Sequence, residues 1–282
     1  MNNLLALVDF DGLLYQASKE TIEESIISLK DRVNNIIEKT NCDFWAGFVG
    51  GEKCFRYNIF PQYKANRTQP KPKWYKTLKA WAIEEYNLNV CNGYESDDAV
   101  SYWKNVKLYQ YASGHIYTEL DEYKGELRLE LNQIICSPDK DILENISSKH
   151  FNYTYKVLDK NNPDSVEKGW FVNTTDEEAE FNKWKQVLKG DSADGVSGLP
   201  GIGEVKAVKI LQDSPLAYSL NTLSKYIDFY QNEASGIYEF QKNYRLLHIL
   251  ENDEDFLREC DKLPEFPKIN KVNKVVKEVI DF

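Results

Sequence analysis

Carboxylate residues occur in short clusters along this sequence, at the points where apolar runs stop. Asp9 and Asp11 follow residues 4–8, a continuous apolar run of the kind found in buried parallel strands. Two more clusters follow the strands expected at 88–91 and 133–136, and their residues are Glu95, Asp97, Asp98, Asp139 and Asp141. Because the carboxyl ends of parallel strands lie along one edge of a sheet, we expect these side chains to converge there.

Converging carboxylates of this number can share one site only if cations neutralise them. Oxygen ligands without paired histidines or cysteines indicate Mg²⁺ or Mn²⁺. Two such ions, about 3.5–4 Å apart, can activate water and stabilise the leaving oxygen in phosphodiester hydrolysis. Each cluster alone has an ordinary explanation, since acidic residues also suit turns and helix N-termini. Four clusters, each at a predicted strand end or in a glycine loop, favour the metal site.

The fourth cluster lies in the glycine-rich stretch 189–203. Asp191 and Asp194 are spaced so that both carboxylates can face one hard cation. The turn residues of the stretch are Gly198, Pro200, Gly201 and Gly203. They predict a tight turn, because glycine permits unusual backbone angles and proline fixes φ. The alternative is an Asx-rich loop with no ligand.

A helix is expected directly after this turn, at 204–211, where apolar residues recur at helical spacing. A glycine turn that opens a helix exposes backbone N–H groups, which suit a phosphate. Lys206 and Lys209 lie in the first turns of the helix. The alternative is an ordinary helix start.

Residues 53–79 form a basic segment within an acidic protein. The segment holds eight Lys or Arg residues, no Asp or Glu, and several interleaved aromatic residues. Basic side chains that bind phosphates, together with aromatic rings that stack on bases, are typical of a channel that binds single-stranded nucleic acid. The alternative is a basic face exposed to solvent. Because the whole chain has a net charge of −10, a local excess of positive charge is unusual, and this favours the interpretation that the segment binds nucleic acid.

The composition limits the class of protein. A chain of 282 residues can form one large or two small domains. Its acidity argues against a protein that simply coats DNA. The five scattered cysteines form no CxxC pair, which indicates a reducing compartment and no zinc site. Without an apolar run of membrane length, we expect a soluble, cytoplasmic protein without a membrane partner.

Strands alternating with helices predict an α/β fold with a parallel sheet. A second strand is expected at 43–49, and Thr21 with Glu24 forms a capping box that begins a helix. We expect an inserted hairpin at 109–131 and a helix at 175–189. After residue 211 we expect only helices, at 216–231, 237–251 and 270–281.

The order and spacing of these motifs resemble the 5′-nuclease (flap endonuclease) superfamily, most closely the phage-type 5′→3′ exonucleases. The matching residues are Asp9 with its strand, Tyr63-Lys64-Ala65-Asn66-Arg67, Glu95-Ser96-Asp97-Asp98, Ser137-Pro138-Asp139-Lys140-Asp141, and the stretch from Gly190-Asp191 to Gly203. The match extends to about residue 211, and a phage-encoded source is one alternative that it raises.

The resemblance implies a parallel-sheet nuclease domain at 1–180, with a basic helical arch at about 55–85. It also implies a helical DNA-binding domain at 181–282, which contains a helix–three-turn–helix motif at 186–211. That motif grips duplex DNA, often with a bound K⁺. The expected partner is DNA with a 5′ end or flap, with an RNA–DNA hybrid as an alternative, and we expect a monomer.

The site residues follow from the same resemblance. Lys64 and Arg67 would contact the scissile phosphate as catalytic residues. Two metal ions would be held by Asp9, Glu95, Asp97, Asp98, Asp139, Asp141, Asp191 and Asp194. Nucleic acid would be bound by Tyr63, Lys64, Arg67, Gly201, Gly203, Lys206 and Lys209.

One part of the sequence departs from the family pattern. The family usually has an Asp after the second strand, where this chain has Gly50-Gly51-Glu52. Either Glu52 substitutes for it or the first metal has fewer ligands, and Asp11 is a further candidate ligand.

Two other functions remain open at this point. Asp9 and Asp11 partly match a haloacid-dehalogenase-like phosphatase, with Asp9 as nucleophile and Asp11 as acid/base, although that motif expects Thr or Val where this chain has Leu13. A non-catalytic module that binds DNA structures is the third interpretation.

Overall fold

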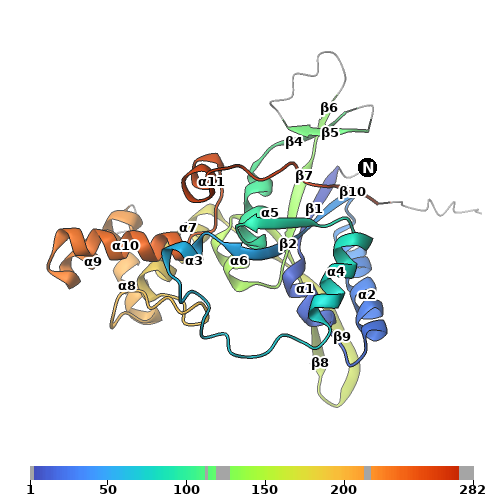
Figure 1. Ribbon diagram of the computed structural model, residues 1–282, viewed down its shortest axis with the longest axis horizontal. Helices are drawn as coiled ribbons and strands as arrows, with labels where there is room; N and C mark the ends of the chain where they lie inside the picture. Colours follow the sequence, from blue (N-terminus) through green and yellow to red (C-terminus); the bar gives the residue numbers. More distant parts are fainter. Residues whose placement is uncertain (1–2, 112–113, 119–127, 213–216, 273–282) are drawn as a thin grey trace, which may run out of the picture.

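The computed structural model describes residues 3–111, 114–118, 128–212 and 217–272, which form a central, mostly parallel sheet with helices on both faces (Figure 1). The order along the sheet is β10-β2-β1-β7-β8-β9, and β3 also pairs with β2. Its strands are β1 (Leu4–Asp9), β2 (Phe44–Cys54), β3 (Asn89–Gly93), β7 (Asn132–Cys136), β8 (Ser148–Asp159), β9 (Asn162–Thr174) and β10 (Asn270–Lys271). The predicted α/β class is confirmed.

The central strand β1 is buried on both faces, which is why its sequence is continuously apolar. Ala6 and Val8 face one core, whereas Leu5 and Leu7 face the other. The first core is covered by α1 (Phe10–Ala17), α2 (Ile22–Thr40) and α4 (Tyr75–Glu85). The second is covered by α5 (Ser96–Asn105), α6 (Lys140–Asn145) and α11 (Asp253–Cys260).

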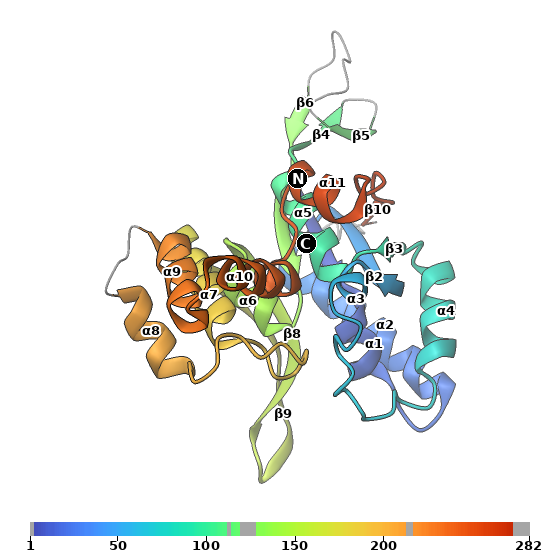
Figure 2. The ribbon, with the colours of Figure 1, turned by 60° about the vertical axis from the view of Figure 1, so that its left-hand side comes forward.

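A group of four helices packs around its own apolar cluster beside the sheet (Figure 2). They are α7 (Asp176–Lys189), α8 (Glu204–Gln212), α9 (Tyr218–Tyr230) and α10 (Glu233–Leu247). The cluster includes Trp184, Leu188 and the fully buried Tyr226. The helices predicted at 175–189, 204–211, 216–231 and 237–251 are therefore confirmed, with small changes at their ends.

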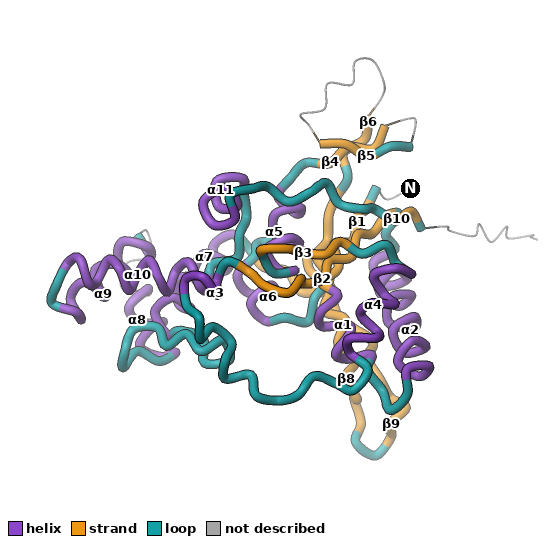
Figure 3. Tube along the Cα trace, viewed as in Figure 1, coloured by secondary structure: helices purple, strands orange, loops and turns teal. Residues whose placement is uncertain are grey.

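Several local expectations were wrong. The segment between α3 (Arg56–Ile59) and α4 is a loop with turns, not the helical part of an arch (Figure 3). Gly50, Gly51 and Glu52 lie inside β2, which pairs with β3 as far as Cys54, so they do not form the turn after that strand.

Other differences concern segments whose pairing partners are distant in the sequence. Residues 270–271 form β10 antiparallel to β2, where a helix was expected, and 273–282 lie outside the described residues. The insertion at 109–131 contributes to a small sheet of β4 (Leu108–Tyr111), β5 (Ile116–Thr118) and β6 (Arg128–Glu130), while 112–113 and 119–127 lie outside the described residues. The hairpin of β8 and β9 and the helix α11 were not predicted.

The C-terminal part of the described chain, α11 and β10, packs against the central sheet, although a helical domain was expected at 181–282. Phe256 of α11 is fully buried in the second core, and β10 extends the sheet beside β2. The expected domain boundary at 180 falls inside α7. None of the helices in the described parts of the chain is long and apolar enough to span a membrane.

Candidate active site

Acidic and basic side chains meet in one pocket at the carboxyl edge of the sheet. Asp9 ends β1, Glu95 follows β3, and Asp139 follows β7. The pocket has a volume of about 680 Å³. Its acidic lining residues are Asp9, Asp11, Glu52, Glu95, Asp97 and Asp139, and its basic ones are Lys53, Lys64, Arg67, Lys71 and Lys79. Of the acids expected to converge from the strand ends, Asp98 and Asp141 are the two that do not line this pocket.

A second pocket, of about 530 Å³, lies on the side of the helical group. Its carboxylates are Asp139, Asp141, Glu144, Asp191 and Glu204. Asp139 and Arg67 line both pockets, so the two hollows adjoin at these side chains. Asp194 lines neither pocket, because its carboxylate is covered by the loop 62–67.

Asp9 is held in place by neutral donors. Its Oδ1 accepts hydrogen bonds from the backbone N–H of Asp11 at 3.1 Å and the Ser96 hydroxyl at 2.9 Å. Its Oδ2 accepts one from the Ser137 hydroxyl at 3.0 Å. The residue is 6% exposed and lines the first pocket.

Four carboxyl groups of the site carry raised pKa values, and burial is the first cause for each, including Asp139. Burial, followed by the charges of Asp11 and Asp139, raises the pKa of Asp9 to about 7. Burial, followed by the charges of Asp139 and Asp191, raises the pKa of Asp141 to about 7. The pKa of Asp97 is also raised, chiefly by burial. Negative charge at this edge is therefore incompletely compensated by the chain itself.

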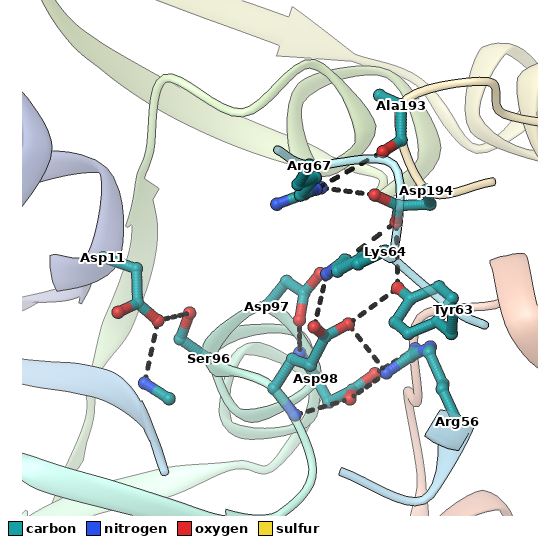
Figure 4. A network of polar contacts seen from close by, with 12 residues as sticks. Asp11, Arg56, Tyr63, Lys64, Arg67, Ser96, Asp97, Asp98, Ala193 and Asp194 are labelled. Carbon is teal, nitrogen blue, oxygen red and sulfur yellow. Dashed lines mark hydrogen bonds and ion pairs between the residues drawn. The ribbon is translucent and has the colours of Figure 1, made fainter. Parts of the chain in front are cut away.

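The loop 62–67 is joined to the carboxylates by a network of polar contacts (Figure 4). The Lys64 ammonium pairs with Glu95 and lies 3.8 Å from Asp194, and Arg67 pairs with Asp194. The Lys64 backbone N–H donates to the Asp194 carbonyl at 2.9 Å. Burial opposes ionisation of Glu95, but Arg56 and Lys64 lower its pKa. The basic loop is thus docked on acidic residues of two distant segments.

Tyr63 has a different place from the one expected. Its side chain is 3% exposed and packs with Cys54, Val196 and Leu246, so the ring has no free face for a base. Its hydroxyl oxygen lies 3.0 Å from Glu95 and 2.9 Å from Asp194, and its single proton can be donated to either carboxylate. The structure therefore assigns Tyr63 to positioning these two carboxylates.

Asp98 is also placed differently from the expected metal ligand. Both of its oxygens accept hydrogen bonds from the Arg56 guanidinium, at 2.7 and 2.8 Å, and it is fully buried. It accepts two further bonds from the backbone N–H groups of Glu95 and Leu250. Both oxygens are therefore occupied by hydrogen bonds within the protein, and the side chain lies outside both pockets. These contacts favour a role for Asp98 in stabilising the fold rather than in binding metal.

Comparisons with known proteins concern the class of protein and the fold. No family model matches the chain. Flap endonuclease Xni of Shewanella pealeana is 25% identical over 227 residues, which cover 75% of this chain and 77% of that protein. DNA polymerase I of Rhizobium leguminosarum is 28% identical over 190 residues, 66% of this chain. The chain spans only 16% and 24% of the length of the Rhizobium and Bacillus caldotenax DNA polymerase I relatives.

Two solved structures from bacteriophage T5 share the fold. A flap endonuclease in a complex with DNA and metal ions aligns with a TM-score of 0.56 and 17% identity over 88% of this chain and 89% of that one. A T5 protein crystallised with metal ions aligns with a TM-score of 0.55 and 18% identity over 88% and 90%. The resemblance to the 5′-nuclease superfamily is confirmed.

The glycine turn and α8 border the second pocket through Gly203 and Glu204. Gly201 has φ of 78°, a left-handed conformation that favours glycine, and it and Gly203 have open space beside them. Lys206 and Lys209 are exposed, and the Lys206 ammonium donates to the Gly201 carbonyl at 2.9 Å. Glu52 is exposed at the rim of the first pocket.

The carboxylates of the pocket suit a hard cation that keeps part of its hydration shell, rather than a metal ion coordinated entirely by protein ligands. No three His, Cys, Asp or Glu side chains in the described parts of the chain form a ready-made metal site. Mg²⁺ keeps several of its waters and often takes only one or two carboxylates directly. The carboxylate oxygens in the pocket and the raised pKa of Asp9 and Asp97 fit such an ion.

Hydroxyl groups were the main functional residues missed from the sequence. Ser96 and Ser137 donate to Asp9, and the Tyr75 hydroxyl donates to Asp11 at 2.9 Å. The signal available was position, since Ser137 directly follows β7 and Ser96 lies between Glu95 and Asp97, three residues after β3.

We expect the affinity for Mg²⁺ to fall as the pH drops below about 7. With pKa values of about 7, Asp9 and Asp141 each hold a proton below that pH, which the cation must displace. A raised carboxyl pKa stabilises the metal-free folded chain at low pH, and this contribution is lost as the pH rises through about 7. Calorimetric Mg²⁺ titrations at about pH 6 and about pH 8 measure the effect, and equal affinities would contradict it.

Proposed function

We propose that this chain is a metal-dependent 5′-nuclease that hydrolyses phosphodiester bonds of DNA. The observation that carries the proposal is the docking of the basic loop 62–67 on the carboxylates of the pocket edge. A phosphate backbone attracted by that loop arrives beside the groups that would hold the cations. The named activity of the Xni relative and the DNA in the T5 complex support the same reaction class.

The proposed cations are two Mg²⁺ or Mn²⁺ ions. Asp9, Glu95, Asp97 and Asp139 would hold metal in the first pocket, and Asp141 and Asp191 in the second. Asp194 would join them as a ligand after release from its contacts with Tyr63 and Arg67. When bound, the ions would supply an activated water and charge for the leaving oxygen. Asp139 lines both pockets, so its carboxylate is positioned to bind a cation in either pocket.

Lys64 and Arg67 are the proposed phosphate contacts. Both line the first pocket, where Lys64 offers a point charge and Arg67 a planar fork. In the described structure their charges are directed at Glu95 and Asp194. Cations bound at those carboxylates would compensate their charge, so that Lys64 and Arg67 could turn to the substrate phosphate.

Helices α7 and α8 with the loop 190–203 form the proposed helix–three-turn–helix motif. Its exposed glycine turn, Lys206 and Lys209 would grip the duplex backbone, with K⁺ as a bound ion. A duplex with a 5′ end or flap is the proposed substrate, and an RNA–DNA hybrid and a monomeric state belong to the same proposal.

The decisive test uses a 5′-labelled flap duplex with Mg²⁺ or with EDTA. Release of short 5′ fragments only with Mg²⁺ supports the nuclease. Hydrolysis of p-nitrophenyl phosphate without DNA cleavage would indicate the phosphatase interpretation instead. Flap binding without either reaction would indicate a binding module.

Lys64→Ala is expected to lower the single-turnover cleavage rate by about 10²-fold or more, while duplex affinity changes by only a few-fold. The side chain is largely buried beside the reacting position and adds little to the exposed charge that attracts DNA. Rates and affinities are measured on the same flap substrate. The matched control is Lys107→Ala, an exposed lysine outside both pockets. A proportional fall in rate and affinity would make Lys64 a binding residue only.

A further inference from the structure

Gly50 and Asp11 occupy complementary positions in the first pocket. A Cβ atom built on Gly50 would lie 2.9 Å from Asp11 Oδ2, closer than real Cβ atoms approach an oxygen. The Asp11 carboxylate therefore lies where a side chain at position 50 would begin. The two positions come from different elements, the first turn of α1 and the interior of β2.

The Asp11 carboxylate is fixed by donors from three elements. Oδ2 accepts hydrogen bonds from the Gly50 N–H at 2.8 Å and the Ser96 hydroxyl at 3.1 Å, and Oδ1 accepts one from Tyr75. The same Ser96 hydroxyl lies 2.9 Å from Asp9 Oδ1. Because a hydroxyl has a single proton, Ser96 can donate to only one of the two carboxylates at a time.

Neither of these two carboxylates forms an ion pair with a described residue, and the same holds for Asp97 and Asp139 in the same pocket. Glu95 and Asp194, by contrast, form ion pairs with Lys64 and Arg67. The ammonium of Lys79 donates to the Gly50 carbonyl, and that of Lys71 lies over the Tyr75 ring. Two adjacent carboxylates with only neutral donors favour a cation from solution.

We propose that Asp11 is a metal-binding residue that occupies the space of a side chain at position 50, so that α1 supplies a carboxylate that β2 lacks. This inference rests on the proposed nuclease function and names a residue of the same site. It also gives Gly50 a role, because any side chain there would displace the Asp11 carboxylate.

The neighbouring residues do not share this role. A Cβ atom on Gly51 would lie 2.5 Å from the Cys91 carbonyl oxygen, so Gly51 is required by packing against β3. Glu52 is exposed at the pocket rim, whereas Asp11 is positioned by three donors. Asp11, rather than Glu52, is therefore the substitute carboxylate.

The test is calorimetric titration of the full chain with Mn²⁺ alone, without DNA. Asp11→Ala is expected to weaken Mn²⁺ binding by about ten-fold or more. Gly50→Ala is expected to weaken it similarly, because the added methyl group displaces the Asp11 carboxylate without changing any charge. The control is Asp164→Asn, an exposed carboxylate on β9, which should bind Mn²⁺ as the wild type does.

A double-mutant cycle shows whether Gly50 acts through Asp11. Adding Gly50→Ala to Asp11→Ala should have no further effect, and adding Gly50→Asp to Asp11→Ala should restore most of the affinity. Additive losses, no restoration, or wild-type affinity of Asp11→Ala would each overturn the inference. If the wild type neither bound Mn²⁺ nor cut the flap, the proposed function itself would fail. If the wild type cut the flap but Asp11→Ala bound Mn²⁺ as tightly as the wild type, only this inference would be overturned.

Discussion

Replacing Asp139 with asparagine is expected to slow DNA cleavage by about 10²- to 10³-fold, while DNA binding is retained. Asp139 lines both pockets, so its charge acts on both sides of the proposed site. Its Oδ1 also caps α6 by accepting the Asp141 N–H at 2.8 Å. Asparagine can make the same cap, so the variant removes the charge and keeps the local structure.

Single-turnover rates at saturating Mg²⁺ measure this effect, and flap affinity in EDTA measures binding. Affinity should not fall, because removing a negative charge cannot weaken attraction to phosphate. The control is Asp176→Asn, an exposed acid in the first turn of α7, which should keep the wild-type rate. A near-normal rate for Asp139→Asn would exclude this carboxylate from the catalytic centre.

The sequence predicts best those features that are determined by local pattern. The apolar run of β1 predicts a strand buried on both faces, and the capping box of Thr21 and Glu24 correctly places the start of α2. Acids after strand ends predict a common site because the geometry of a parallel sheet requires it. The pocket lined by Asp9, Glu95 and Asp139 follows from these signals alone.

Features set by distant pairing could not be read from local pattern. Residues 270–271 became a strand because they pair with the free edge of β2 at Trp45 and Phe44. The second strand was expected to end at residue 49, but pairing with β3 keeps Gly50 and Gly51 in β2.

The same limit applies to individual site residues. Lys64 was expected to face nucleic acid, whereas in the described structure it pairs with Glu95, 31 positions away. The spacing of acids also cannot show which carboxylate faces the pocket. Asp97 and Asp98 are adjacent, yet only Asp97 lines the pocket, because the fold brings Arg56 against Asp98. A buried guanidinium 42 positions away in the chain decides the role of Asp98.

Asp98→Ala is accordingly expected to destabilise the fold by about 3–5 kcal/mol, because it leaves the Arg56 charge buried without its partner. Arg56 is 2% exposed, and its guanidinium also donates to the carbonyls of Leu246 at 3.0 Å and His248 at 2.7 Å. The pair therefore ties the end of α10 to α5. Loss of one partner affects both elements.

Chemical denaturation of the metal-free chain measures this destabilisation without any contribution from the active site. The control is Glu85→Gln, which removes the exposed pair of Lys30 and Glu85, 3.7 Å apart, and should cost no more than about 1 kcal/mol. If Asp98 were instead a metal ligand, Asp98→Ala would chiefly weaken Mn²⁺ binding. The stability of the metal-free chain would then stay the same or rise, because the change would relieve repulsion among the carboxylates. A large loss of metal-free stability therefore identifies Asp98 as the anchor of Arg56.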